Sequence, residues 1–102
     1  MKAHRHLIKQ ALADGHMISV YDGMEWSLKR STSYTAIVNE VEGTEDAQLR
    51  IRDKNGDYLG TALIIAYGVG DDDTVADWGV NENNYIGRWF DVYQSELESN
   101  TH

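Results

Sequence analysis

The residues best able to do chemistry are four aspartates in the stretch YGVGDDDTVADWG, residues 67–79, which we call the acidic loop. Carboxylates bind Ca²⁺ when they occupy fixed positions of an EF-hand loop that has glycine near its middle. Counted from Asp71, such a loop has valine at a ligand position and alanine at the glycine position, which excludes an EF-hand. A looser magnesium site on Asp71, Asp72 or Asp73 stays open. We favour a helix N-terminus, where carboxylates face the positive end of the helix dipole.

Histidine, serine and cysteine patterns predict no zinc or nucleophile site. His4 and His6 are two residues apart, so on a helix they point away from each other and do not converge on a metal. The chain has no cysteine, which excludes disulfides, thiolate ligands and a thiol nucleophile. It has no G-x-S-x-G elbow, and the G-x-G of residues 68–70 is followed by acid, which repels phosphate. We expect no cofactor, no metal and no catalysis, and keep a small enzyme that uses surface carboxylates as an alternative.

The charge of the chain limits the kinds of partner that we expect it to bind. The formal net charge is −8, from nine basic and seventeen acidic residues. Residues 31–102 hold four of the basic and fourteen of the acidic residues. Such a field repels nucleic acid and membrane surfaces and attracts basic partners. We therefore expect a protein partner that is basic or itself binds nucleic acid, and we expect neither direct nucleic-acid binding nor membrane binding.

The cellular compartment is indicated by three features. The first fifteen residues, MKAHRHLIKQALADG, are interrupted by charge and lack the apolar run of a signal peptide. No apolar run reaches the roughly 18–20 residues that a membrane-spanning helix needs. The lack of cysteine fits a reducing compartment. Together these features predict a cytoplasmic protein.

Helical spacing of apolar residues appears in three segments. The first precedes Asp14-Gly15, which is a fitting helix stop. The second spans residues 31–43, begins with a run of hydroxyl residues able to cap it, and ends at Gly43. The third spans residues 81–99, with Asn83 or Asn84 as its cap. Its apolar stripe consists of Ile86, Trp89, Phe90, Tyr93 and Leu97.

Alternation of apolar and polar residues predicts four strands, at residues 16–22, 26–30, 47–53 and 58–68. Asn55-Gly56 predicts a type I′ turn between the last two. The fourth strand is apolar on both faces over residues 62–66, which predicts a central strand or a strand that is covered on both sides. After the acidic loop, TVADW predicts a short helical turn. The order α-β-β-α-β-β-α indicates a single α+β domain, residues 1–102, with a four-stranded, mainly antiparallel sheet packed by helices.

One basic group interrupts the acidic character. Arg50, Arg52 and Lys54 alternate onto the outer face of the third predicted strand, with Tyr58 beside them. Basic and aromatic side chains on a sheet face can contact RNA. The net charge of −8 argues against that use, and a sheet with one face in water shows the same alternation without any ligand.

The phrases ISVYDGMEWSLKRSTSYTAI, EDAQLRIRD and GDDDTVADW resemble small acidic proteins encoded by bacteriophages and prophages of enteric bacteria. This resemblance implies a small cytoplasmic accessory protein and assigns no catalytic residue. Separately, YIGRWFD at residues 85–91 is similar to a short stretch of antirestriction proteins of the DNA-mimic kind. That similarity assigns no residue role either.

The sequence therefore predicts a phage or prophage accessory protein that acts by protein–protein interaction without catalysis. The alternative is a DNA mimic, whose carboxylates would occupy the basic cleft of a DNA-binding protein or enzyme. A homodimer through an exposed strand edge is also open. Trp89 is expected in the core and Trp78 at the surface. The predicted protein-binding residues lie in the acidic loop and the C-terminal helix: Asp71, Asp72, Asp73, Asp77, Trp78, Trp89 and Tyr93.

Overall fold

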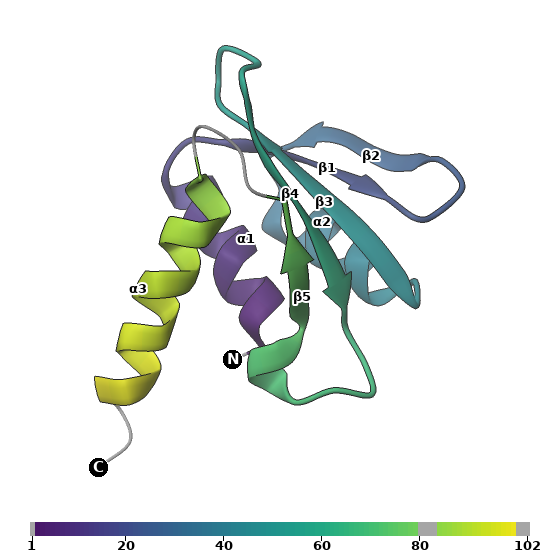
Figure 1. The fold of residues 1–102 in the computed structure, drawn as a ribbon. Coiled ribbons are helices and arrows are strands. Elements are labelled where there is room, and N and C mark those ends of the chain that lie inside the picture. The colour runs from purple at the N-terminus through teal and green to yellow at the C-terminus, as the bar shows by residue number, and fades with distance from the viewer. Residues whose placement is uncertain (1, 80–83, 100–102) are drawn as a thin grey trace.

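The computed structural model describes residues 2–79 and 84–99. These residues form a single compact α+β domain with three helices and one antiparallel sheet (Figure 1). In chain order the elements are helix α1 (Ala3–Ala13), strands β1 (Met17–Tyr21) and β2 (Trp26–Ser31), helix α2 (Tyr34–Glu42), strands β3 (Asp46–Arg52) and β4 (Tyr58–Ile65), the 3-10 turn η1 (Asp71–Asp73), strand β5 (Val75–Trp78) and helix α3 (Tyr85–Ser99).

The sheet has the strand order β2-β1-β3-β4-β5, and every neighbouring pair is antiparallel. The predicted count of four strands is wrong, because Val75–Trp78 pairs with β4 where a helical turn was predicted. The three aspartates of η1 make the turn themselves, and Val75 then pairs with Ile64. This pairing places β4 between β3 and β5, so it is an interior strand, which agrees with the first of the two alternatives predicted from its apolar faces.

The core lies between one face of the sheet and the helices. Helix α1 packs between α2 and α3, and the helices contact β1 to β4. In the sheet, Ile18 pairs with Ile51 and Val20 pairs with Leu49, so these side chains share the inner face. The largest fully buried apolar side chains are Leu7, Ile8, Ile18, Val20, Ile37, Val41, Leu49, Ile51, Ile64 and Ile86. Apolar burial of this kind is the main stabilising contribution in a domain of this size.

The opposite face of the sheet carries no described helix, and we call it the open face. Strand alternation brings one side chain in two to this face. Ser19 pairs with Arg50, and Arg50 pairs with Thr61, so the three lie in one row across β1, β3 and β4. The strand residues of the open face are Met17, Ser19, Tyr21, Trp26, Asp46, Gln48, Arg50, Arg52, Tyr58, Thr61, Leu63, Ile65 and Asp77.

The turn between β3 and β4 differs from the predicted type I′ turn. Gly56 has a φ of +88°, but Asn55 is not among the described residues with positive φ. The Gly56 amide donates to the Asp53 carbonyl at 2.9 Å, and the Asp53 carboxylate accepts the amides of Asn55 and Asp57. This is a type I turn over residues 53–56, closed by a left-handed glycine. It begins one residue earlier than a turn with Asn55-Gly56 at its centre would, because the Asp53 side chain stabilises it through these two hydrogen bonds.

The helix boundaries follow local side-chain chemistry. Ser33 caps α2, since its hydroxyl accepts the Ala36 amide at 3.3 Å, and Gly15 follows α1 with a φ of +86°, as the sequence indicates. At the start of α3, the Asn84 side chain lies so close to Gly87 that a Cβ there would stand 2.3 Å from the Asn84 Oδ1. Glycine at position 87 therefore makes room for the Asn84 side chain. The other predicted cap, Asn83, lies outside the described residues.

Candidate functional site

The acidic loop is tied to the body of the domain by hydrogen bonds. Asp72 accepts the Tyr93 hydroxyl at 2.7 Å, and burial together with this bond raises the pKa of Tyr93. The Thr74 hydroxyl, fully buried, accepts the backbone amide of His4 at 3.0 Å. Asp71, Asp72 and Asp73 themselves stay exposed at the surface. Within residues 2–79 and 84–99, three or more His, Asp or Glu side chains nowhere gather in a way that could hold a metal ion.

The predicted aromatic contact residues are largely internal. Trp89 and Tyr93 are each 4% exposed and stack at 5.3 Å between ring centroids, which places Trp89 in the core. The Trp89 indole N–H donates to His6 Nδ1 at 2.9 Å, so the His6 proton sits on Nε2 and faces Glu96. Trp78 is half-buried against Phe90, with 4.8 Å between the ring centroids.

The seven predicted residues therefore do not form one continuous contact surface of carboxylates and rings. Asp72 and Tyr93 meet through their hydrogen bond, whereas Trp89 is enclosed and Asp77 lies opposite Leu63 on the open face of β5. The exposed part of the predicted set is the four aspartates, and in this fold they are the groups that a partner can reach directly.

A buried polar cluster joins α1 to α2. His4 is 0% exposed, and its Nε2 lies 2.8 Å from the Glu42 carboxylate, which Arg5 also engages with two nitrogens at 2.6 Å each. The two Arg5 hydrogen bonds hold the pKa of Glu42 at about 2. Burial lowers the pKa of His4 and outweighs the opposing effect of Glu42. The enclosed His4 Nδ1 has no hydrogen-bond partner in the described structure. The cluster links α1 to α2, with His4 enclosed, Glu42 largely covered and Arg5 partly exposed.

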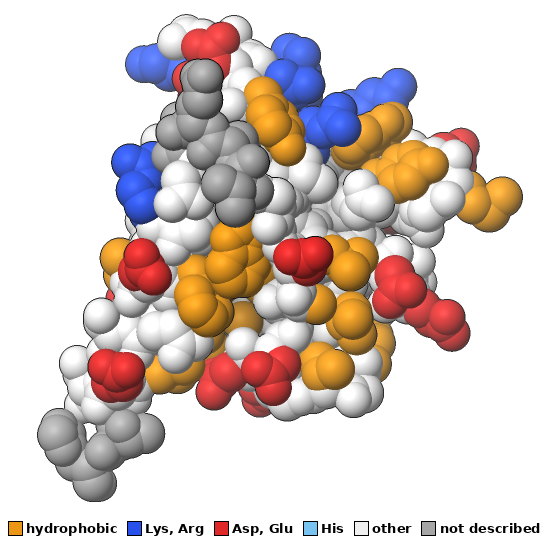
Figure 2. All heavy atoms as spheres, in the orientation of Figure 1, with side chains coloured by type: hydrophobic (Ala, Val, Ile, Leu, Met, Phe, Trp, Pro, Cys, Tyr) orange, Lys and Arg blue, Asp and Glu red, His pale blue; other side chains and the backbone are white. Residues whose placement is uncertain are grey.

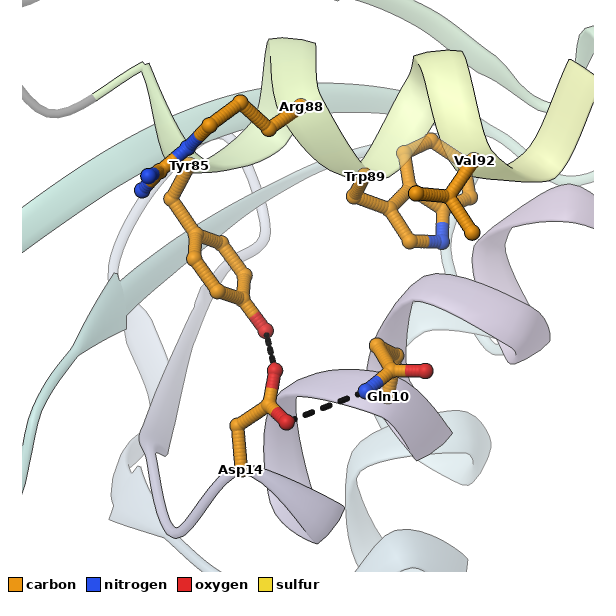
Figure 3. A pocket seen from close by; sticks show the side chains of 6 residues that line it. All are labelled: Gln10, Asp14, Tyr85, Arg88, Trp89 and Val92. Atoms are coloured by element: carbon orange, nitrogen blue, oxygen red, sulfur yellow. Dashed lines mark hydrogen bonds between the residues drawn. The ribbon is translucent and has the colours of Figure 1, made fainter.

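A cavity of about 370 Å³ lies between α1 and α3 (Figure 3). The Asp14 carboxylate accepts the Tyr85 hydroxyl at 2.6 Å and the Gln10 amide at 3.0 Å, so these three polar groups already bind one another. Trp89 and Val92 form its apolar wall. Burial and the bond to Asp14 raise the pKa of Tyr85, which keeps this hydroxyl a donor.

The open face holds a different kind of site, a shallow depression of about 200 Å³. We call it the basic hollow. Its position on β1, β2 and β3 follows from a β-bulge, since Lys29 and Arg30 together oppose the single residue Ser19. The Ser19 hydroxyl accepts the Arg30 amide at 2.9 Å and fixes the bulge. The basic hollow is lined by Ser19, Trp26, Lys29, Arg30, Arg50 and Arg52.

Arg30 adopts an uncommon backbone conformation, with a φ of +50°. A side chain other than glycine in this region costs on the order of 1 kcal/mol. The strained conformation and the bulge let two successive basic residues reach the same depression.

Aromatic rings hold the arginines in place. The Arg50 guanidinium lies over Trp26 at 4.5 Å from the ring centroid, and Tyr58 lies 5.9 Å from it. Arg52 sits 5.8 Å from the Tyr58 ring and donates to the Gly56 carbonyl at 2.9 Å. Stacking on a ring leaves the edge of a guanidinium, where its N–H groups are, available to an anion.

The basic hollow has no internal counter-charge. The described ion pairs all lie on the helix side, at Glu42 and Glu96, and none reaches Lys29, Arg30, Arg50 or Arg52. The Arg50 Nε is buried and has no hydrogen-bond partner in the described structure. Figure 2 shows most of the visible Lys and Arg side chains in the upper part of the view, beside hydrophobic ones and with acidic side chains at the top among them, and it shows further acidic side chains over the rest of this face. Four cations without carboxylates, in a chain of net charge −8, form a prepared anion site.

Sequence reasoning found half of this site. The alternation of Arg50, Arg52 and Tyr58 on one strand face was visible, and the structure places these residues on the open face as the alternation indicates. The contribution of Lys29 and Arg30 was missed, because a regular strand would send these neighbours to opposite faces. The sequence feature that could have indicated this contribution is the pair of adjacent basic residues before Ser31, where the strand ends.

No protein-family model matches this chain, and no curated protein or solved structure shows significant similarity to it. The helices in the described parts of the chain are too short or too polar to cross a membrane. The functional argument therefore depends on the residues of the open face and on the helix side against which they can be compared.

Proposed function

We propose that this protein is a small accessory domain, of the phage-encoded kind that its sequence resembles, which binds another protein without catalysis. The cysteine-free composition supports action in the cytoplasm. The open face of the sheet is the docking surface, and the basic hollow is its centre.

The observation that carries this proposal is the pairing of exposed rings with unpaired arginines on an uncovered sheet. Tyr58 is 45% exposed, and Arg50 is stacked between this ring and Trp26. Arginine, tyrosine and tryptophan are the residues enriched at the energetic centres of protein interfaces. A large side chain that is already held in place loses little conformational entropy when a partner docks, which favours binding.

The helix side gives weaker support for a contact surface. Trp89 and Tyr93 of α3 are packed into the core, and Tyr85, Asp14 and Gln10 of the α1–α3 cavity bind one another. The exposed aspartates of the acidic loop remain a predicted contact for a basic partner, as the sequence indicates.

A selection experiment tests the proposal. A random peptide library is selected on the wild-type domain, and the selected peptides are measured against the double variant Arg50→Ala/Tyr58→Ala. The matched control is Lys9→Ala/Tyr34→Ala, which removes one cation and one tyrosine from α1 and α2. Circular dichroism establishes that both variants keep the fold.

Two outcomes are distinguishable. Peptides that bind the wild type and the control, and lose about tenfold or more in affinity for the open-face variant, support the proposal. Peptides that bind all three proteins equally, or bind only through α1 and α2, would contradict it, as would a library that yields no binder.

A further inference from the structure

We propose that the basic hollow recognises a short acidic segment of the partner protein, held in extended conformation, with two carboxylates spaced i and i+2. This inference deepens the proposed function and depends on it, because it names the chemistry of the partner at that same surface.

The first argument is the number of unpaired cations in one depression. Lys29 and Arg30 arrive from the bulge of β2, and Arg50 and Arg52 arrive from β3. Among the described residues none of the four has a carboxylate at ion-pair distance. Like charges so close together repel each other, and an anion relieves that repulsion.

The second argument is the unused donor inside the hollow. The Arg50 Nε is buried without an acceptor, although a guanidinium binds carboxylate with parallel N–H groups. An unsatisfied buried donor destabilises the folded protein. Because the Arg50 Nε is closed off from solvent, a carboxylate reaches it only when the Arg50 side chain turns, and the carboxylate then supplies the missing acceptor.

The turns beyond the two ends of the hollow limit the length of the ligand. Asp53 and Asp57 follow Arg52, with Lys54 between them, and Asp22 and Glu25 lie in the β1–β2 turn beyond Tyr21. Each turn therefore carries a net negative charge, and the hollow between them is basic. A ligand whose negative charge is confined to the middle gains attraction without meeting repulsion at its ends.

This charge pattern separates an acidic peptide from a nucleic acid. A nucleic-acid strand carries phosphate along its whole length and would place negative charge against both acidic turns. The net charge of −8 adds a long-range repulsion that grows with the charge of the ligand. A peptide with two carboxylates meets neither obstacle to the same degree, so the acidic segment is the ligand that the geometry favours.

The spacing of the two carboxylates follows from β3. Arg50 and Arg52 lie two residues apart on the same face, which separates their backbones by about 7 Å. A partner segment laid along β3 in extended conformation presents its own i and i+2 side chains at the same interval. Two acidic residues with one residue between them therefore face both arginines at once.

The test uses capped synthetic peptides and the intact protein. The probe is Gly-Ser-Glu-Ser-Glu-Ser-Gly, with a glutamine analogue, a regrouped peptide whose two glutamates are adjacent, and a short oligothymidylate as comparisons. Affinity is measured by titration calorimetry, and the Arg Nε–H resonances are followed by NMR. The variants are Arg50→Gln and the matched surface control Lys9→Gln.

The expected result is that the probe binds about tenfold or more tightly than its glutamine analogue and shifts the Arg50 Nε–H resonance. Arg50→Gln should lower the affinity for the probe by about tenfold, while Lys9→Gln should change that affinity by less than about twofold. Equal binding of the glutamine analogue, no binding of the probe, or tighter binding of the oligothymidylate would overturn the inference. Equal binding of the regrouped peptide would overturn the spacing.

Failure of this inference can be told apart from failure of the proposed function. If library peptides need Arg50 and Tyr58 but carry no acidic residues, the open face is still a protein-binding surface and its carboxylate chemistry is refuted. If no library peptide depends on these two residues, both ideas fall together.

Discussion

The acidic loop and the basic hollow are both clusters of like charge, yet the fold treats them differently. Around the acidic loop, Asp72 accepts the Tyr93 hydroxyl and the buried Thr74 hydroxyl accepts the His4 amide. In the basic hollow, Arg50 keeps a buried donor without an acceptor. The acidic loop, which stands out in the sequence, is thus hydrogen-bonded to the rest of the domain. The basic hollow, which does not stand out in the sequence, keeps donors that a ligand could use.

The same contrast separates the two sides of the molecule. The polar clusters on the helix side are held together by hydrogen bonds between their own members, although His4 Nδ1 has no partner, so removing one member should cost stability. The cations of the open face repel one another, so removing one should cost binding and little or no stability. Four predictions test this contrast, in order of decreasing effect on the free energy of unfolding.

The largest effect is expected for Glu42→Gln. This change leaves the buried His4 without a carboxylate and removes the two charged hydrogen bonds from Arg5. The free energy of unfolding should fall by about 2–3 kcal/mol, measured by urea denaturation. The control Glu40→Gln, exposed on the same helix, should change it by less than about 0.5 kcal/mol. Equal effects of the two variants would show that the cluster is not a structural link.

The second effect is a loss of stability in acid. The pKa of His4 is lowered in the folded protein, so the unfolded chain binds the proton more readily and unfolding becomes easier as the pH falls below about 6.5. The pKa of Glu42 is lowered from 4.5 to about 2, so a further loss begins below pH 4.5 and continues toward pH 2.

Urea denaturation at a series of pH values measures this dependence. The fall below pH 4.5 should be smaller in Glu42→Gln than in the wild type, because the variant has no carboxyl group to protonate at this position. A stability that rises as the pH falls from 6.5 to 4.5 would contradict the assignment of a neutral buried His4.

The third effect concerns the link between α3 and η1. Tyr93→Phe removes the hydroxyl that donates to Asp72 and should cost about 1 kcal/mol of unfolding free energy. Asp72→Asn should have a smaller effect than Tyr93→Phe, because Asp72 is exposed and water replaces its hydrogen bond. Thermal denaturation measures both, and an unchanged Tyr93→Phe variant would show that the acidic loop is not held by α3.

The smallest effect has the opposite sign and belongs to the open face. Arg30→Gly removes a left-handed arginine and should raise the free energy of unfolding by up to about 1 kcal/mol. It should also lower the affinity for the acidic probe peptide, measured in the same calorimetric titration. A variant that loses stability, or that binds the probe as tightly as the wild type, would contradict the role of Arg30 as a binding residue.

How far the sequence predicts this fold can be seen at two neighbouring segments. Residues 62–66, apolar on both faces, predict a central strand or a strand that is covered on both sides, and β4 is an interior strand. The adjoining TVADW predicts a helical turn, yet Val75 pairs with Ile64 in a fifth strand. A short segment has no periodicity long enough to decide between the two forms, so its partner strand decides.

The site shows the same division. The sequence by itself determined the helical stripes, the strand alternation that puts Arg50 and Arg52 on one face, and the excess of acid, because each is a local or periodic property of the residues. Only the tertiary structure decided that Lys29 and Arg30 join them and that Trp26 and Tyr58 hold Arg50. The physical reason is that a bulge and a cross-strand contact exist only once particular strands have paired in one register.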